Sequence, residues 1–131
     1  MEGRILIVDD ELSIRNLFED IFYGSPYSVC SSESADDALT VLKNEDINVI
    51  FLDLKLFGMN GIELCRRIRA NKPLAIIYAI TGWSGLFEVE ECREAGFDDY
   101  FTKPLTIDRI QQSVDDAFEK ISRWTNRRNV P

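Results

Sequence analysis

The stretch Val49-Ile50-Phe51-Leu52-Asp53 decides the fold of this chain. Its four consecutive apolar residues, three of them β-branched or aromatic, predict a strand that is buried on both faces of a sheet. We expect this central strand to run from Ile47 to Leu52. Because ligands of open α/β sheets bind at the carboxyl ends of the strands, Asp53 is a candidate functional residue. The alternative is that Asp53 is only the polar residue with which the chain leaves the core.

Length and composition place the chain among ordinary globular proteins. Its 131 residues suffice for one domain with a single core, and 45% of them are apolar and 29% charged. The longest apolar run is too short to cross a membrane, and Met1-Glu2-Gly3-Arg4 shows no signal-peptide pattern. We therefore expect a cytoplasmic protein without a membrane partner.

Charge is unevenly distributed along the chain. The net charge of −8 argues against nucleic acid as a partner of the folded body. Four of the 15 basic residues lie near the C-terminus: Lys120, Arg123, Arg127 and Arg128. We expect a domain at residues 1–122, followed at residues 123–131 by a basic tail or the start of a linker.

The cysteines do not indicate metal or redox chemistry. Three of them, Cys30, Cys65 and Cys92, stand far apart within apolar patterns, and the chain has no histidine. Zinc sites and Cys-His catalysis therefore lack their usual partner residues. All three cysteines are predicted to be reduced core residues.

Four further apolar runs predict strands, and a helical pattern follows each strand. The additional strands are expected at residues 5–8, 27–31, 74–80 and 100–102. The helices are expected after Asp9-Asp10-Glu11, from Ser34, from Gly61, over residues 86–95 and from Thr106. The last helix carries five apolar residues on one face: Ile107, Ile110, Val114, Phe118 and Ile121.

Strict alternation of strand and helix predicts a parallel sheet with helices on both faces. Crossovers between parallel strands are right-handed, which leaves few topologies. Five strands fit the doubly wound order 2-1-3-4-5, in which ligands bind at the crevice between strands one and three. The predicted fold class is therefore α/β, with a five-stranded, flavodoxin-like parallel sheet.

Polar residues follow four of the five predicted strands: Asp9-Asp10-Glu11, Asp53, Thr81 and Lys103. Because all strands of a parallel sheet point the same way, these side chains should gather along one edge. Each has an ordinary explanation by itself. Acidic residues favour the dipole at the start of a helix, Thr81 could simply end a strand, and Lys103 could be a surface charge. Their coincidence at one edge indicates a functional site instead.

Carboxylates gathered at one edge require a cation. Unit charges about 4 Å apart repel by roughly 1 kcal/mol in water and by about 4 kcal/mol at an effective dielectric constant of 20. Oxygen ligands without histidine or thiolate suit Mg²⁺ or Mn²⁺, and Mg²⁺ often shares its shell with phosphate oxygens. We therefore predict a phosphoryl group at the site, with Asp53 as nucleophile, Lys103 neutralising charge and Thr81 donating a hydrogen bond.

Residues 4–121 resemble the receiver domain of bacterial two-component response regulators. The resemblance rests on Asp9-Asp10, Asp53, Thr81-Gly82, Lys103-Pro104 and the loop glycine Gly61. It implies that Asp53 accepts a phosphoryl group from the phosphohistidine of a histidine kinase or a histidine phosphotransfer protein. It also implies a signalling phosphoacceptor that catalyses only its own phosphorylation and dephosphorylation, rather than an enzyme in the usual sense.

The same resemblance implies a ligand set for Mg²⁺. Asp10, Asp53 and the main-chain carbonyl of Lys55 would hold the ion directly. Asp9 would act on it through a water molecule.

The resemblance further implies a switch and a partner surface. Thr81 and Tyr100 would form the switch, small Gly82 would leave the phosphoryl group accessible, and the Lys103–Pro104 peptide bond would be cis. The face made by the fourth helix, the fifth strand and the fifth helix would bind a partner or form a homodimer. The chain would either act as a stand-alone receiver or form the front of a longer regulator with a C-terminal output domain.

Three positions depart from the usual pattern of the family. Phe57 stands where a proline is common, Asn60 stands where an aspartate is frequent, and Trp83 is unusually bulky. Lys55 offers no carboxylate or amide that could orient a water molecule. We therefore expect Trp83 and Lys55 to slow hydrolysis of the phosphoryl group.

Three other functions fit parts of the pattern. A phosphohydrolase of the haloacid-dehalogenase type needs a second acid two residues after Asp53, where Lys55 stands. A flavodoxin-like FMN carrier needs a hydroxyl- and glycine-rich phosphate loop after the first strand, where Asp9-Asp10-Glu11 would repel a phosphate. A degenerate receiver would serve only as a docking module, against which the intact set of acids, Thr81 and Lys103 argues.

Overall fold

The computed structural model describes residues 3–56, 58–82 and 86–128, and in them five strands alternate with five helices. Their order along the chain is β1 (Gly3–Val8), α1 (Leu12–Phe22), β2 (Tyr27–Ser32), α2 (Ala35–Asn44), β3 (Val49–Asp53), α3 (Gly61–Asn71), β4 (Ile76–Thr81), α4 (Leu86–Ala95), β5 (Asp99–Thr102) and α5 (Ile107–Arg128). All neighbouring strands are parallel, and the sheet order is β2-β1-β3-β4-β5. The predicted topology is confirmed.

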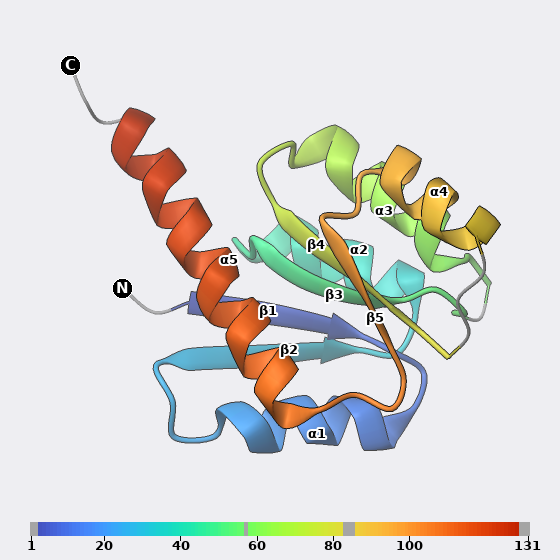
Figure 1. Ribbon diagram of the computed structural model, residues 1–131, viewed down its shortest axis with the longest axis horizontal. Helices are drawn as coiled ribbons and strands as arrows, with labels where there is room; N and C mark the ends of the chain where they lie inside the picture. The colour runs from blue at the N-terminus through green and yellow to red at the C-terminus, as the bar shows by residue number, and fades with distance from the viewer. Residues whose placement is uncertain (1–2, 57, 83–85, 129–131) are drawn as a thin grey trace.

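The sheet separates two hydrophobic clusters, so the molecule has three layers (Figure 1). One cluster joins the sheet to α2, α3 and α4, and the other joins it to α1 and α5. Alternate residues of β3 enter the two clusters: Ile50 and Leu52 face the first, and Val49 and Phe51 face the second. Each of these four side chains is at most 1% exposed. The strand is therefore buried on both faces, as its composition predicts.

Several strand boundaries differ from the prediction by one or two residues, and two apolar residues that were predicted to lie in strands lie outside them. Ile47 is fully buried but precedes β3, and Leu74 is 50% exposed and precedes β4. An apolar residue next to a strand looks the same in sequence whether or not it joins the hydrogen-bonded ladder. Both strands instead include the polar residue after the apolar run, because Asp53 and Thr81 still pair with residues of the neighbouring strands.

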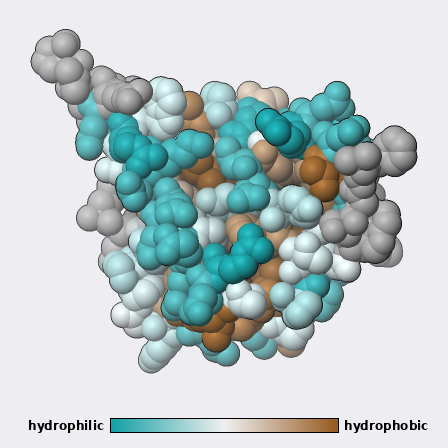
Figure 2. All heavy atoms as spheres, in the orientation of Figure 1, coloured by the Kyte–Doolittle hydropathy of each residue, from teal (hydrophilic) through white to brown (hydrophobic). Residues whose placement is uncertain are grey.

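The last helix is longer and less regular in its packing than expected. Ile107, predicted on the inner face, is 52% exposed because it is the first residue of α5 and the buried residues of the helix begin at Ile110. The helix continues to Arg128, so the domain boundary expected at residue 122 lies inside it. Figure 2 shows mostly hydrophilic side chains along the outward side of α5.

The remaining core predictions agree with the structure. All three cysteines are free, with Cys65 and Cys92 buried and Cys30 half-buried against the same cluster. Burial raises the pKa of the Cys65 thiol to about 12 and that of Cys92 to about 11, so neither is a reactive thiolate near neutral pH. No helix among the described residues is long and apolar enough to cross a membrane.

The start of α3 presses closely on the end of β3. The amide of Gly61 donates a hydrogen bond to the carbonyl of Leu54 over 3.0 Å, and the side chain of Asn60 caps the helix by accepting a 2.8 Å hydrogen bond from the amide of Glu63. A Cβ atom on Gly61 would lie 2.3 Å from the carbonyl oxygen of Asp53 and 2.8 Å from the Cα of Leu54. Only glycine permits this approach, which holds the backbone of Asp53 in place.

We predict that Gly61→Ala lowers the free energy of unfolding by about 1–3 kcal/mol, because the new methyl group must displace main-chain atoms. Urea unfolding followed by circular dichroism measures the effect. The matched control is Gly82→Ala, since no described atom lies within 4 Å of a Cβ built there. Equal stability of the Gly61→Ala variant and the wild type would contradict the close contact.

Candidate functional site

Four strands deliver the predicted polar residues to one edge of the sheet. Asp9 follows β1, Asp53 ends β3, Thr81 ends β4, and Lys103 follows β5. The hydrogen-bonded ladder continues into these residues: the amide of Asp9 donates to the carbonyl of Ser32 over 3.1 Å, and the amide of Lys103 donates to the carbonyl of Thr81 over 2.8 Å. The sheet itself therefore sets the backbone positions of the site.

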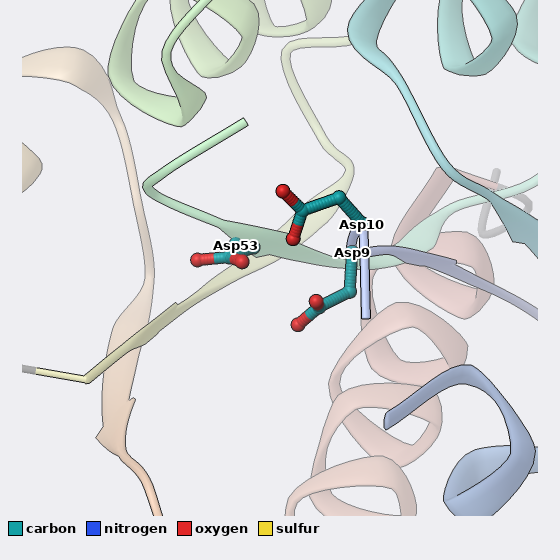
Figure 3. Close-up of side chains that lie close together, drawn as sticks. All are labelled: Asp9, Asp10 and Asp53. Carbon is teal, nitrogen blue, oxygen red and sulfur yellow. The ribbon is translucent and has the colours of Figure 1, made fainter. Parts of the chain in front are cut away.

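Three aspartates form an acidic trio: Asp9, Asp10 and Asp53. One carboxylate oxygen from each lies within 4.8 Å of the others. Figure 3 shows Asp9 and Asp10 extending from the end of β1 beside Asp53 at the end of β3. Asp9 is fully buried and Asp53 is 4% exposed, whereas Asp10 is exposed to solvent. The trio is thus open to solvent on the side of Asp10.

Main-chain amides orient the two buried carboxylates. Oδ1 of Asp9 accepts a 2.9 Å hydrogen bond from the amide of Glu11, and Oδ1 of Asp53 accepts a 3.1 Å hydrogen bond from the amide of Lys55. The Oδ2 atoms face Nζ of Lys103, at 3.3 Å from Asp9 and 3.6 Å from Asp53. Oδ2 of Asp9 has no hydrogen-bond partner of good geometry among the described residues.

Lys103 has a third and closer partner, Glu11. Its Nζ lies 2.9 Å from Oε1 of Glu11, nearer than to either buried aspartate. Burial lowers the pKa of Lys103, but the hydrogen bond to Glu11 and the charges of Asp9 and Asp53 outweigh burial and raise the pKa above its usual value. The lysine is therefore a cation throughout the physiological range.

The surroundings of Asp9 disfavour its ionised form. Burial raises its pKa to about 6; the charge of Asp53 adds to this, and the amide of Glu11 and the Lys103 ammonium oppose it. One ammonium therefore does not fully compensate the buried charge. An all-oxygen donor set with a buried oxygen that lacks a hydrogen-bond partner fits a hard divalent cation such as Mg²⁺.

Thr81 is 2% exposed, and its hydroxyl donates a 2.7 Å hydrogen bond to Oε1 of Glu88 in α4. The sequence pattern did not single out Glu88, which is seven residues further along the chain and on a different element. Gly82 after Thr81 is exposed, and among the described residues no atom lies within 4 Å of a Cβ built there.

The other predicted residues lie around this centre. Tyr100 on β5 is half-buried against the cluster shared with α4, and the Lys103–Pro104 peptide bond is cis. The side chain of Lys55 is exposed. Phe57 and Trp83 lie outside the described residues, so the expectation that Trp83 slows hydrolysis stays a prediction.

Comparison with known proteins gives a consistent result. The model of the response regulator receiver domain family matches residues 5–115. Sporulation initiation phosphotransferase F of Bacillus subtilis is 32% identical over 114 residues, which cover 87% of this chain and 92% of that protein. The probable transcriptional regulator ycf27 of Porphyridium aerugineum is 28% identical over 128 residues, 98% of this chain but only 53% of that protein. This chain spans only about a quarter of the length of other curated relatives.

A solved structure agrees with this assignment. The CheY-like response regulator receiver domain protein from Methanospirillum hungatei superimposes with a TM-score of 0.86 at 28% identity, covering 94% of this chain and 99% of that one. This chain therefore belongs to the response regulator receiver domains of two-component signalling systems.

Proposed function

We propose that this receiver domain takes a phosphoryl group on Asp53 from the phosphohistidine of a histidine kinase or a histidine phosphotransfer protein. The observation that carries the proposal is the placement of Asp53: a nearly buried carboxylate within the acidic trio, with Nζ of Lys103 3.6 Å from its Oδ2. A degenerate receiver that serves only as a docking module would not require this grouping of carboxylates with a lysine.

In the proposed reaction, an oxygen of the Asp53 carboxylate forms a bond to phosphorus while the phosphorus–nitrogen bond of the donor breaks. The donor's imidazole carries a proton on its other ring nitrogen, so the nitrogen that keeps the electron pair of the broken bond leaves as part of a neutral imidazole. Lys103 neutralises negative charge on the phosphoryl oxygens, and the hydroxyl of Thr81 donates a hydrogen bond to one of them. The product is an acyl phosphate on Asp53.

We propose that Asp10, Asp53 and the main-chain carbonyl of Lys55 hold Mg²⁺, or Mn²⁺ in its place, and that Asp9 acts through water. The bound ion would neutralise the carboxylates and the charge of the phosphoryl oxygens. The exposed side of the trio at Asp10 leaves room for water ligands, which Mg²⁺ usually retains. Asp9, fully buried, suits an indirect role.

We expect acetyl phosphate with Mg²⁺ to add one phosphoryl group to the protein and Asp53→Asn to abolish this addition, because the amide is not a nucleophile. Intact-mass spectrometry measures the product, which should be stable in acid and labile in base. Asp36→Asn is the control, since Asp36 is an exposed carboxylate in the first turn of α2 and does not belong to the acidic trio. Labelling of Asp53→Asn at the wild-type rate would exclude Asp53 as the acceptor.

Mg²⁺ affinity should depend on pH. The pKa of Asp9 is raised to about 6, so lowering the pH through that value protonates Asp9 and removes a charge that attracts the ion. Calorimetric titration from about pH 8 down to about pH 5 should show a severalfold loss of affinity in the wild type. Asp9→Asn should remove most of this pH dependence, whereas Asp10→Ala should weaken binding about tenfold or more at every pH. Unchanged affinity in Asp10→Ala would show that the ion binds elsewhere.

We further propose that α4, β5 and α5 form the surface that changes on phosphorylation and contacts a partner or a second copy. Tyr100 lies on β5 three residues before Lys103 and packs against the cluster that includes α4. Amide chemical shifts along these three elements should therefore move when beryllofluoride, a phosphoryl mimic, binds with Mg²⁺. Shifts confined to the neighbourhood of Asp53 would refute the coupling.

A further inference from the structure

Both hydrogen-bond donors of the proposed phosphoryl site already have a glutamate as their nearest carboxylate partner. The hydroxyl of Thr81 donates to Oε1 of Glu88 over 2.7 Å, and the ammonium of Lys103 lies 2.9 Å from Oε1 of Glu11. Neither glutamate belongs to the acidic trio. In this structure, the two donors are therefore paired with carboxylates of the protein itself.

The two contacts differ in their consequences for a phosphoryl group. An ammonium has three hydrogens, so Lys103 can bind a phosphoryl oxygen and keep Glu11. A hydroxyl has a single hydrogen, so Thr81 can donate either to Glu88 or to a phosphoryl oxygen, but not to both. The contact between Thr81 and Glu88 is therefore the one that excludes the phosphorylated arrangement.

Glu88 differs from the other acidic residues of α4. Glu90, Glu91 and Glu94 are exposed, whereas Glu88 is half-buried in the first turn of the helix. A negative charge in a first turn is favoured by the helix dipole, which explains the residue type at this position but not its contact with a nearly buried hydroxyl. The contact joins the first turn of α4 directly to the end of β4.

We propose that Glu88 is a positioning residue that competes with the phosphoryl group on Asp53 for the hydroxyl of Thr81. The inference rests on the proposed function and adds to it the group that must be displaced. When Glu88 is released, the first turn of α4 loses this contact with β4. Phosphorylation at one edge of the sheet then changes the surface of that helix. The competing contact stabilises only the unphosphorylated state and therefore weakens binding of a phosphoryl mimic.

The first experiment titrates beryllofluoride into the protein at saturating Mg²⁺ and follows amide chemical shifts by NMR. Glu88→Ala should bind about threefold to tenfold more tightly than the wild type, because a charge-assisted hydrogen bond no longer has to be broken. Glu88→Gln, which keeps an acceptor but loses the charge, should fall between the two. Glu90→Ala is the matched control: it removes the same charge from the exposed side of the same helix and should bind as the wild type does.

A double-mutant cycle with Thr81→Val separates this competition from a general effect of charge. Valine keeps the shape of the buried side chain but has no hydroxyl for Glu88 to hold. In the Thr81→Val background, Glu88→Ala should therefore leave beryllofluoride affinity unchanged. Thermal unfolding of each variant verifies that it is folded before the titration.

The outcomes distinguish the inference from the function on which it rests. A wild type that binds beryllofluoride as tightly as Glu88→Ala overturns the competition while leaving Asp53 as the acceptor. An equal gain from Glu88→Ala in the Thr81→Val background also overturns it, because the gain then comes from charge alone. A wild type that binds no beryllofluoride and takes no phosphoryl group overturns the proposed function, and the inference with it.

Discussion

The burial of two neighbouring carboxylates is the constraint on which the site depends. Asp9 directly follows β1 and Asp53 ends the adjacent strand β3, and hydrogen bonding between the two strands prevents the carboxylates from moving apart. Two main-chain amides and the ammonium of Lys103 compensate part of the charge. The raised pKa of Asp9 shows that the compensation is incomplete. This arrangement of charge is the basis of the proposal that the site binds a divalent cation.

Rigid backbone contacts hold the carboxylates in this arrangement. The aliphatic and aromatic side chains of β3 fill both clusters, and Gly61 fixes the main chain directly after Asp53. The amide of Lys103 donates a hydrogen bond to the carbonyl of Thr81, so the main-chain segments that carry the ammonium and the hydroxyl are held side by side. Because a well-packed core deforms little, a new group on Asp53 is accommodated mainly by its side-chain neighbours. Thr81, Glu88 and the first turn of α4 are the neighbours best placed to respond.

In this structure, carboxylates of the protein itself accept the hydrogen bonds of the two donors at the site. Glu11 accompanies Lys103 and Glu88 accompanies Thr81, so in the proposed reaction a phosphoryl group would enter a site whose donors are already engaged. The proposed exchange of one acceptor for another would couple a local charge to a helix without requiring the core to rearrange. It would also give Thr81 two discrete arrangements, which a two-state switch requires.

The sequence by itself determined the topology and the members of the edge constellation, because periodicity, glycines and strand-terminal polar residues are local signals that the parallel sheet translates directly into space. It could not decide which apolar residues at element ends are buried, as Ile47, Leu74 and Ile107 illustrate. It also could not decide that Glu11 partners Lys103 or that Glu88 partners Thr81. Those contacts join residues of different elements, and only the packing of α1 and α4 against the sheet edge brings their side chains within hydrogen-bonding distance.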